Sequence, residues 1–177
     1  TIEPRLAIQK RITNTVVDAG DRIGVTLVIT NSGLATAYDL AWRDVLNPLH
    51  FDAASVSNTL VPTGFVFSVE TNVVVVRSDT NSAAPASTVE AGEGLVVRFD
   101  VTVSSNLPPN TVFTNTAVIQ PYDTISGTPT INQQRVYGPT QAVDVLSAPN
   151  LSAVKSLFAT SEVGPSDSLT NSTQVGE

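Results

Sequence analysis

Apolar and polar side chains alternate in the first residues of the chain. Leu6, Ile8, Lys10 and Ile12 fall on one face of an extended strand, because successive side chains of a strand point to opposite faces. Three of these four residues are apolar, so this face is predicted to be buried with a lysine in its middle. A buried ammonium without a partner is costly. We therefore expect the fold to supply a partner for Lys10.

The same alternation recurs along the chain and predicts further strands, separated by turns rich in Gly, Pro, Asn and Asp. The predicted strands cover residues 5–12, 23–30, 37–45, 65–69, 73–76, 95–103, 112–120 and 141–146. The more polar stretches are predicted to be loops, and they cover residues 49–63, 78–94 and 121–134. About seven to nine strands with turn signals between them are typical of an all-β, immunoglobulin-like antiparallel β-sandwich.

The opening pattern returns near the end of the chain. Residues 149–157 repeat residues 4–12, and Lys155 corresponds to Lys10 at an offset of 155 − 10 = 145 residues. Repetition at domain length is typical of tandem arrays. We therefore expect residues 1–147 to form one complete sandwich. Residues 148–177 are expected to be a linker and the truncated start of a second repeat, which is either flexible or donates a strand.

Composition narrows the classes of function. The chain has no cysteine, which excludes disulfides and thiolate metal sites. Its net charge is −7 with only 14% charged residues and no basic patch, which argues against a nucleic-acid partner. No apolar run approaches the roughly 20 residues of a membrane helix, so we expect no membrane insertion by this segment. Because it begins at Thr1 and lacks methionine, the chain is expected to be a segment of a longer protein.

Two further polar residues lie on strand faces that are otherwise apolar. Asp44 shares a face with Trp42, and Asn115 shares a face with Ala117. A lysine, an acid and an amide buried together could form an isopeptide bond without an enzyme. Burial lowers the pKa of Lys10 and makes a neutral amine available as nucleophile. Burial also raises the pKa of Asp44, which could then hydrogen-bond and polarise the Asn115 carbonyl while ammonia leaves.

Two simpler interpretations remain open. Lys10 could pair with Asp44 as an ordinary salt bridge, with Asn115 satisfying a backbone group. Alternatively, the three residues could be unrelated surface positions. Intact mass separates these interpretations from the cross-link, since the bond lowers the mass by about 17 Da through loss of ammonia.

Other candidate sites have weaker signals. Asp18, Asp21, Glu90 and Glu93 lie in predicted turns, but they lack the spacing of a calcium-binding loop, and solvated turns are the favoured interpretation. His50 is the one histidine of the chain, and no nucleophile motif accompanies it. We predict no metal site, no cofactor and no enzymatic activity on an external substrate, so the expected chemistry is limited to autocatalytic cross-linking.

Several spaced motifs together resemble the repeat domains of large bacterial surface and fimbrial proteins that form isopeptide bonds. These motifs are the first strand with its lysine and the segments at residues 18–21, 28–33, 43–48, 91–93 and 115–117. The resemblance covers nearly all of the first domain. It implies a cross-link between Lys10 and Asn115, with Asp44 as the assisting acid. The family usually has Thr-Leu-Pro after this acid, whereas the present chain reads Val45-Leu46-Asn47-Pro48 after Asp44.

The sequence therefore favours a structural stalk or spacer repeat in an extracellular protein of the bacterial cell surface. Its expected partners are neighbouring repeats of the same protein. One alternative is an adhesive module that binds a host or glycan ligand through the predicted loops. Another is a filament subunit that assembles with other copies by strand donation.

Overall fold

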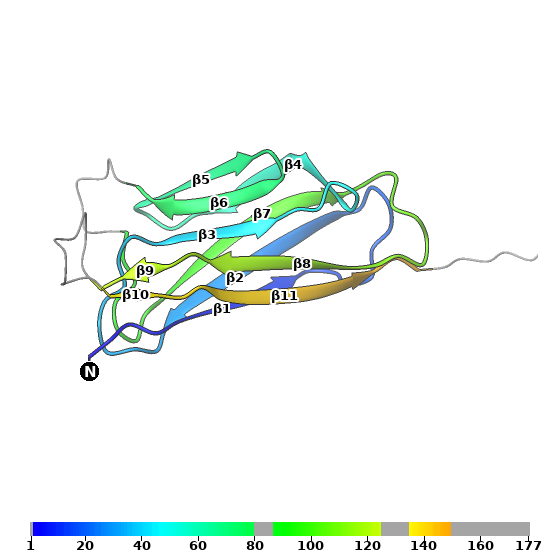
Figure 1. The fold of residues 1–177 in the computed structure, drawn as a ribbon. Coiled ribbons are helices and arrows are strands. Elements are labelled where there is room, and N and C mark those ends of the chain that lie inside the picture. Colours follow the sequence, from blue (N-terminus) through cyan, green and yellow to red (C-terminus); the bar gives the residue numbers. More distant parts are fainter. Residues whose placement is uncertain (1, 80–86, 125–134, 150–177) are drawn as a thin grey trace, which may run out of the picture.

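A computed structural model describes residues 2–79, 87–124 and 135–149, and these residues form an immunoglobulin-like β-sandwich (Figure 1). Within these ranges the chain contains strands, turns and coil but no helix, and hence no helix that could span a membrane. The predicted second repeat lies almost wholly outside the described residues, which end at Pro149.

Two antiparallel sheets form the sandwich. Sheet A has the strand order β1 (Leu6–Ile12), β2 (Arg22–Asn31), β7 (Gly94–Val103) and β4 (Phe51–Leu60). Sheet B has the order β11 (Thr140–Ser147), β8 (Val112–Ile119), β3 (Ala41–Val45), β6 (Val73–Ser78) and β5 (Phe65–Glu70). A separate two-stranded ribbon consists of β9 (Tyr122–Asp123) and β10 (Val136–Tyr137).

Inward-facing side chains of both sheets form one apolar core. In β2 the buried positions alternate with partly exposed ones, as expected for a strand with one face against a core. Trp42 of β3 packs against Phe65 of β5, with ring centroids 5.1 Å apart. Phe99 of β7, in the other sheet, is fully buried, and its ring centroid lies 6.1 Å from that of Phe67 on β5. The predicted fold class is therefore confirmed.

The predicted loop at residues 49–63 is wrong, because most of it forms β4. Its sequence lacks apolar alternation, and its pairing with β7 shifts register between Asp52 and Ser57. An edge strand with an irregular register needs less apolar patterning than a central one. The third strand starts at Ala41 rather than residue 37, after Asp39 with its positive φ of 54°. The described residues form eleven strands, more than predicted, because the β9–β10 ribbon adds two to the nine of the main sheets.

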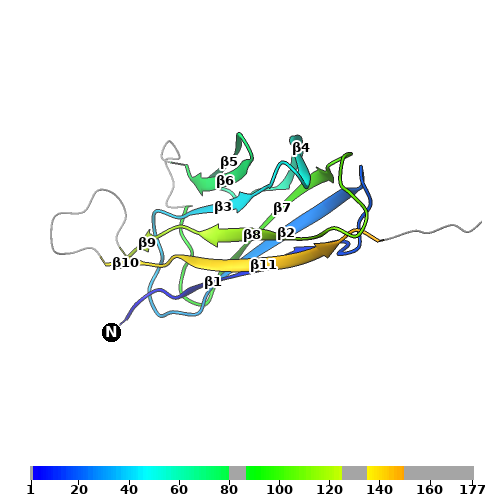
Figure 2. The same cartoon turned by 45° about the vertical axis from the view of Figure 1, so that its right-hand side comes forward.

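The N-terminal segment contacts both sheets at one side of the sandwich. β1 pairs with β2 of sheet A, whereas Val16 forms a parallel bridge with Ser147 at the end of β11 in sheet B. Two backbone hydrogen bonds hold that bridge, from Val17 N to Ser147 O (3.0 Å) and from Ser147 N to Thr15 O (2.8 Å). Both views of the ribbon show β1 beside β11 (Figures 1 and 2). Inward side chains of β1 can therefore reach residues of both sheets.

Candidate cross-linking site

The described core contains four buried polar residues: Lys10, Asn31, Asp44 and Asn115. Asn31 is fully satisfied, because its oxygen accepts hydrogen bonds from the backbone of Arg5 and Gly33, and its nitrogen donates to two carbonyls. The other three residues meet at one point between the sheets. These are the three residues that the sequence singled out.

The strand register explains why the three side chains meet. Asp44 on β3 is paired with Ala117 on β8, and Asn115 lies two residues from Ala117 on the same face. Asp44 and Asn115 are therefore diagonal neighbours within sheet B. Lys10 lies on the inward face of β1, which contacts both β8 and β11. The lysine thus approaches the Asp44–Asn115 pair from the opposite sheet.

Asp44 bridges the other two side chains. Lys10 Nζ donates a hydrogen bond to Oδ2 of Asp44, and neither side chain is exposed. Asn115 Nδ2 donates to the other carboxyl oxygen, Oδ1, over 2.7 Å. The same nitrogen also donates to the backbone oxygen of Val45 over 2.9 Å. One carboxyl group therefore contacts both the candidate nucleophile and the nitrogen that would leave.

Burial dominates the electrostatics of this pair. Desolvation lowers the pKa of Lys10, although the neighbouring Asp44 opposes that shift. Desolvation likewise raises the pKa of Asp44 against the opposing effect of Lys10. Both shifts favour the uncharged forms, an amine and a carboxylic acid. An uncharged amine is the form of lysine that acts as a nucleophile.

The contact between Asp44 and Asn115 differs from the expected one. Asp44 was expected to hydrogen-bond the side-chain carbonyl of Asn115, but it contacts the amide nitrogen. The backbone oxygen of Val45 fixes this orientation, since a carbonyl can accept but not donate. Oδ1 of Asn115 consequently points elsewhere, and it is buried without a hydrogen-bond partner.

A fourth polar residue of the site was missed by the sequence analysis. Asp144 on β11 is paired with Asn115 and lies on the half-buried face that includes Ala142 and Leu146. Its Oδ2 is buried and has no hydrogen-bond partner. Its charge also acts on Lys10, whose pKa it raises. Its strand face also carries Thr140 and is only half-buried, so the signal that identified Lys10, a charged residue on an otherwise apolar face, is weak here.

This arrangement has the components for amide exchange. It contains a desolvated amine, a side-chain amide and a carboxyl group that contacts both nitrogens. A bond from Lys10 to Asn115 would join β1 of sheet A to β8 of sheet B. It would close a loop of 115 − 10 = 105 residues.

The turn acids make local contacts. Asp21 Oδ2 accepts a hydrogen bond from the backbone nitrogen of Asp18 over 2.8 Å, which closes the turn. Glu93 N donates to the oxygen of Glu90 in a second turn. Within the described ranges, no three His, Asp or Glu side chains are grouped so that they could hold a metal ion.

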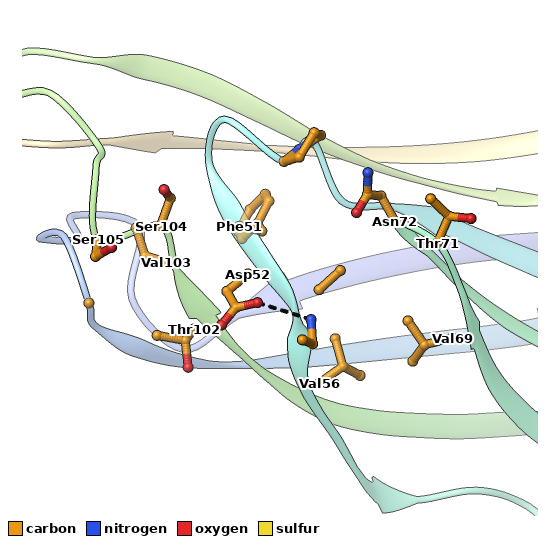
Figure 3. A pocket seen from close by; sticks show the side chains of 14 residues that line it. Phe51, Asp52, Val56, Val69, Thr71, Asn72, Thr102, Val103, Ser104 and Ser105 are labelled. Atoms are coloured by element: carbon orange, nitrogen blue, oxygen red, sulfur yellow. Dashed lines mark hydrogen bonds between the residues drawn. The ribbon is translucent and has the colours of Figure 1, made fainter.

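An open groove of about 800 Å³ lies apart from the buried site (Figure 3). Residues of β4, of the turn between β5 and β6 and of the end of β7 line it. Among the described lining residues, Asp52 is the one charged group, and its Oδ1 accepts a hydrogen bond from Ala54 N over 3.0 Å. The groove shares no described residue with the Lys10 site.

Comparison with known proteins supports the fold. No protein-family model and no curated protein matches the sequence. Among solved structures, the chain resembles the major pilin SpaD of Corynebacterium diphtheriae at 14% identity and a TM-score of 0.50, covering 78% of this chain and 34% of the pilin. It also resembles BcpA, the major pilin subunit of Bacillus cereus, at 10% identity and a TM-score of 0.54, covering 82% of this chain and 40% of the pilin.

A third similar structure is not a pilin. It is the seventh ScaB type I cohesin of Pseudobacteroides cellulosolvens, at 11% identity and a TM-score of 0.50, covering 86% of this chain and 99% of the cohesin. The chain thus spans between a third and two-fifths of the two pilins but nearly the whole cohesin. Identities this low show a shared sandwich fold and nothing further.

Proposed function

We propose that this chain is a structural stalk or spacer module of an extracellular bacterial surface or fimbrial protein, cross-linked internally by a Lys10–Asn115 isopeptide bond. The observation that carries the proposal is the Asp44 carboxyl group, which contacts both the Lys10 and the Asn115 nitrogens inside an apolar core. The similarity in fold to two major pilins agrees with a structural role.

The physical basis of the proposal is proximity combined with desolvation. The sandwich holds the amine and the amide against the same carboxyl group, and such fixed placement can contribute roughly 7–11 kcal/mol to lowering a barrier. Lys10 and Asn115 lie in different sheets, so the bond would tie the two layers of the sandwich together. A module with this tie would resist both extension and proteolysis.

Intact mass tests the proposal. The wild-type chain is expected about 17 Da below its sequence mass, because one ammonia leaves for each bond formed. Lys10→Ala and Asn115→Ala are each expected at their full sequence mass. Asn31→Ala is the matched control, because it removes the other buried asparagine of the described core and should leave the loss of ammonia intact. A wild-type mass equal to the sequence mass would contradict the cross-link.

Ligand binding through loops has less support than the structural role. One of the three predicted loops is largely strand β4, and most of residues 121–134 lie outside the described residues. Strand donation by residues 148–177 also concerns a segment that is almost entirely outside the described residues. Deleting residues 150–177 and measuring the size of the assembly by light scattering tests the filament alternative.

A further inference from the structure

Two buried oxygen atoms at the site lack a hydrogen-bond donor. One is Oδ1 of Asn115, and the other is Oδ2 of Asp144. Their residues are directly paired, Asn115 on β8 with Asp144 on β11, and opposed side chains on one face of a sheet lie about 5 Å apart at Cβ. Two buried acceptors on directly paired residues are unfavourable, because each has lost water without gaining a donor.

A single proton between the Asn115 and Asp144 oxygens would give both of them a hydrogen bond. A protonated Asp144 can donate its O–H to the side-chain oxygen of Asn115, whereas an ionised one cannot. Asp44 cannot take this role, since both of its oxygens are occupied by the Lys10 and Asn115 nitrogens. Asp44 therefore contacts the two nitrogens, and a different group must donate to the Asn115 oxygen. From the sequence, both roles were expected of Asp44.

We propose that Asp144 is a second catalytic acid of this site, which donates a hydrogen bond to Oδ1 of Asn115 and stabilises the negative charge that develops there. This inference rests on the proposed Lys10–Asn115 bond. Donors aimed at a developing oxyanion are among the larger contributions to acyl-transfer catalysis. Without Asp144, this oxygen has no donor among the described residues.

The reaction then balances with the groups present. The lone pair of the neutral Lys10 amine attacks Cγ of Asn115, and the carbonyl electron pair moves onto Oδ1, where the Asp144 proton stabilises it. Asp44, as a carboxylic acid, gives a proton to Nδ2 and takes one from Nζ. The carbonyl re-forms, the Cγ–Nδ2 bond breaks and ammonia leaves. Both acids end in their starting protonation states, and no oxidant or reductant is needed.

An ionised Asp144 would oppose the proposed reaction. The groups that act on it across the interior are Lys10 from β1 and Asp44 from β3. A negative charge at position 144 raises the pKa of Lys10 and so opposes formation of the neutral nucleophile. It would also repel the oxyanion.

The test compares Asp144→Asn with Asp144→Ala. Each full-length chain is obtained unfolded, refolded by dilution into one buffer, and followed by intact mass over time. Asp144→Asn keeps an N–H donor at this position, so it is expected to lose ammonia at a rate close to that of wild type. Asp144→Ala removes the donor and is expected to react about 10²- to 10³-fold more slowly. Asp123→Ala is the control, because Asp123 is a partly buried acid that also has an unpartnered oxygen and lies outside the site.

The outcomes separate this inference from the proposed function. If wild type loses ammonia and Asp144→Ala does so equally fast, the second acid is contradicted while the bond stands. A rate for Asp144→Asn as low as that of Asp144→Ala contradicts it too. If Asp144→Ala fails to fold by circular dichroism, the rate of Asp144→Asn decides, and a rate about 10²-fold below that of wild type contradicts the inference. A wild-type chain that keeps its ammonia overturns both proposals.

Discussion

Lys10 and Asp44 bury their ionisable atoms completely, and burial shifts their pKa values in opposite directions. An ordinary salt bridge would do the reverse, because each charge would stabilise the other. These directions favour a neutral pair, and the dependence of stability on pH distinguishes a neutral pair from an ion pair. The distinction can be measured when the bond is prevented from forming.

The pH dependence of stability follows from these directions. Asp44 has a raised pKa, so the folded state keeps its proton above the ordinary value of 3.8, and stability falls as the pH rises from there. Lys10 has a lowered pKa, so just below 10.5 the unfolded state holds the proton, and stability rises toward that pH. Asn115→Ala cannot form the bond, so it leaves Lys10 and Asp44 as an unlinked pair. In this variant the contribution of the pair to stability is expected to pass through a minimum between pH 3.8 and pH 10.5.

Urea unfolding at a series of pH values measures this contribution. The reference is a chain that also carries Lys10→Met and Asp44→Leu, so that the difference between the two chains isolates the buried pair. A maximum at intermediate pH instead of a minimum would identify an ion pair and contradict the neutral pair.

Substitution of Asp44 tests its role between the two nitrogens. Asp44→Asn preserves the size of the side chain but cannot carry a proton from Nζ to Nδ2, and Asp44→Ala removes both contacts. Both variants are expected to keep their ammonia. Asp44→Ala should also lose about 1–3 kcal/mol of unfolding free energy, because it leaves the neutral Lys10 amine buried without a hydrogen-bond partner. Normal loss of ammonia in Asp44→Asn would remove Asp44 from the mechanism.

At the scale of elements, Asn31 holds the start of β1 against the end of β2. Its side chain makes four hydrogen bonds, to the backbone of Arg5, Gly33, Ala35 and Val89. Asn31→Ala would leave several of these buried groups unpaired and is expected to cost about 2–4 kcal/mol. Its cross-link should be unaffected, as judged by intact mass after folding. A normal unfolding midpoint for this variant would contradict the structural role.

The strands that were predicted correctly are those with one face on the core. In β2 and β7, strict alternation of apolar residues marks the inward face, and the structure confirms it. β4 was missed because it pairs with a single strand through an irregular register, so that little of its sequence is constrained by burial. The other edge strands, β1, β5 and β11, pair in a regular register and were predicted, so periodicity fails at an irregular register rather than at an edge.

Three of the four polar residues of the site could be predicted from the sequence. Lys10, Asp44 and Asn115 each interrupt a strand face that is otherwise apolar, and all three are buried. Asp144 interrupts a half-exposed face at the sheet edge, where polar residues are common. Which atom of Asn115 meets Asp44 depends on the backbone oxygen of Val45, and strand periodicity carries no information on such a contact.

At the scale of the molecule, the proposed bond would bypass most of the chain under load. By analogy with disulfides, closing a 105-residue loop would stabilise the fold by about 4–5 kcal/mol through the unfolded state. The mechanical effect would be larger. Force applied at the two ends would pass from β1 through the bond to β8, so the segment between residues 10 and 115 would remain folded or slack.

Single-molecule pulling measures this bypass directly. When Lys10→Ala unfolds, it is expected to release roughly 350–380 Å more chain than wild type, because each of the 105 additional residues extends by about 3.3–3.6 Å. Lys155→Ala is the matched control, since it removes the lysine of the predicted second repeat and should extend as wild type does. Equal extension of Lys10→Ala and wild type would show that no covalent tie spans the sandwich.

The central claim is a covalent bond between two particular residues, and peptide mapping tests it most directly. Trypsin cannot cleave after an acylated Lys10, so a digest of the folded, bonded chain should contain one branched species that joins residues 6–11 to residues 99–135. Fragmentation of that ion should place the link between Lys10 and Asn115. Recovery of residues 6–10 as a linear peptide ending at Lys10, with residues 99–135 separate and at full mass, would contradict the account.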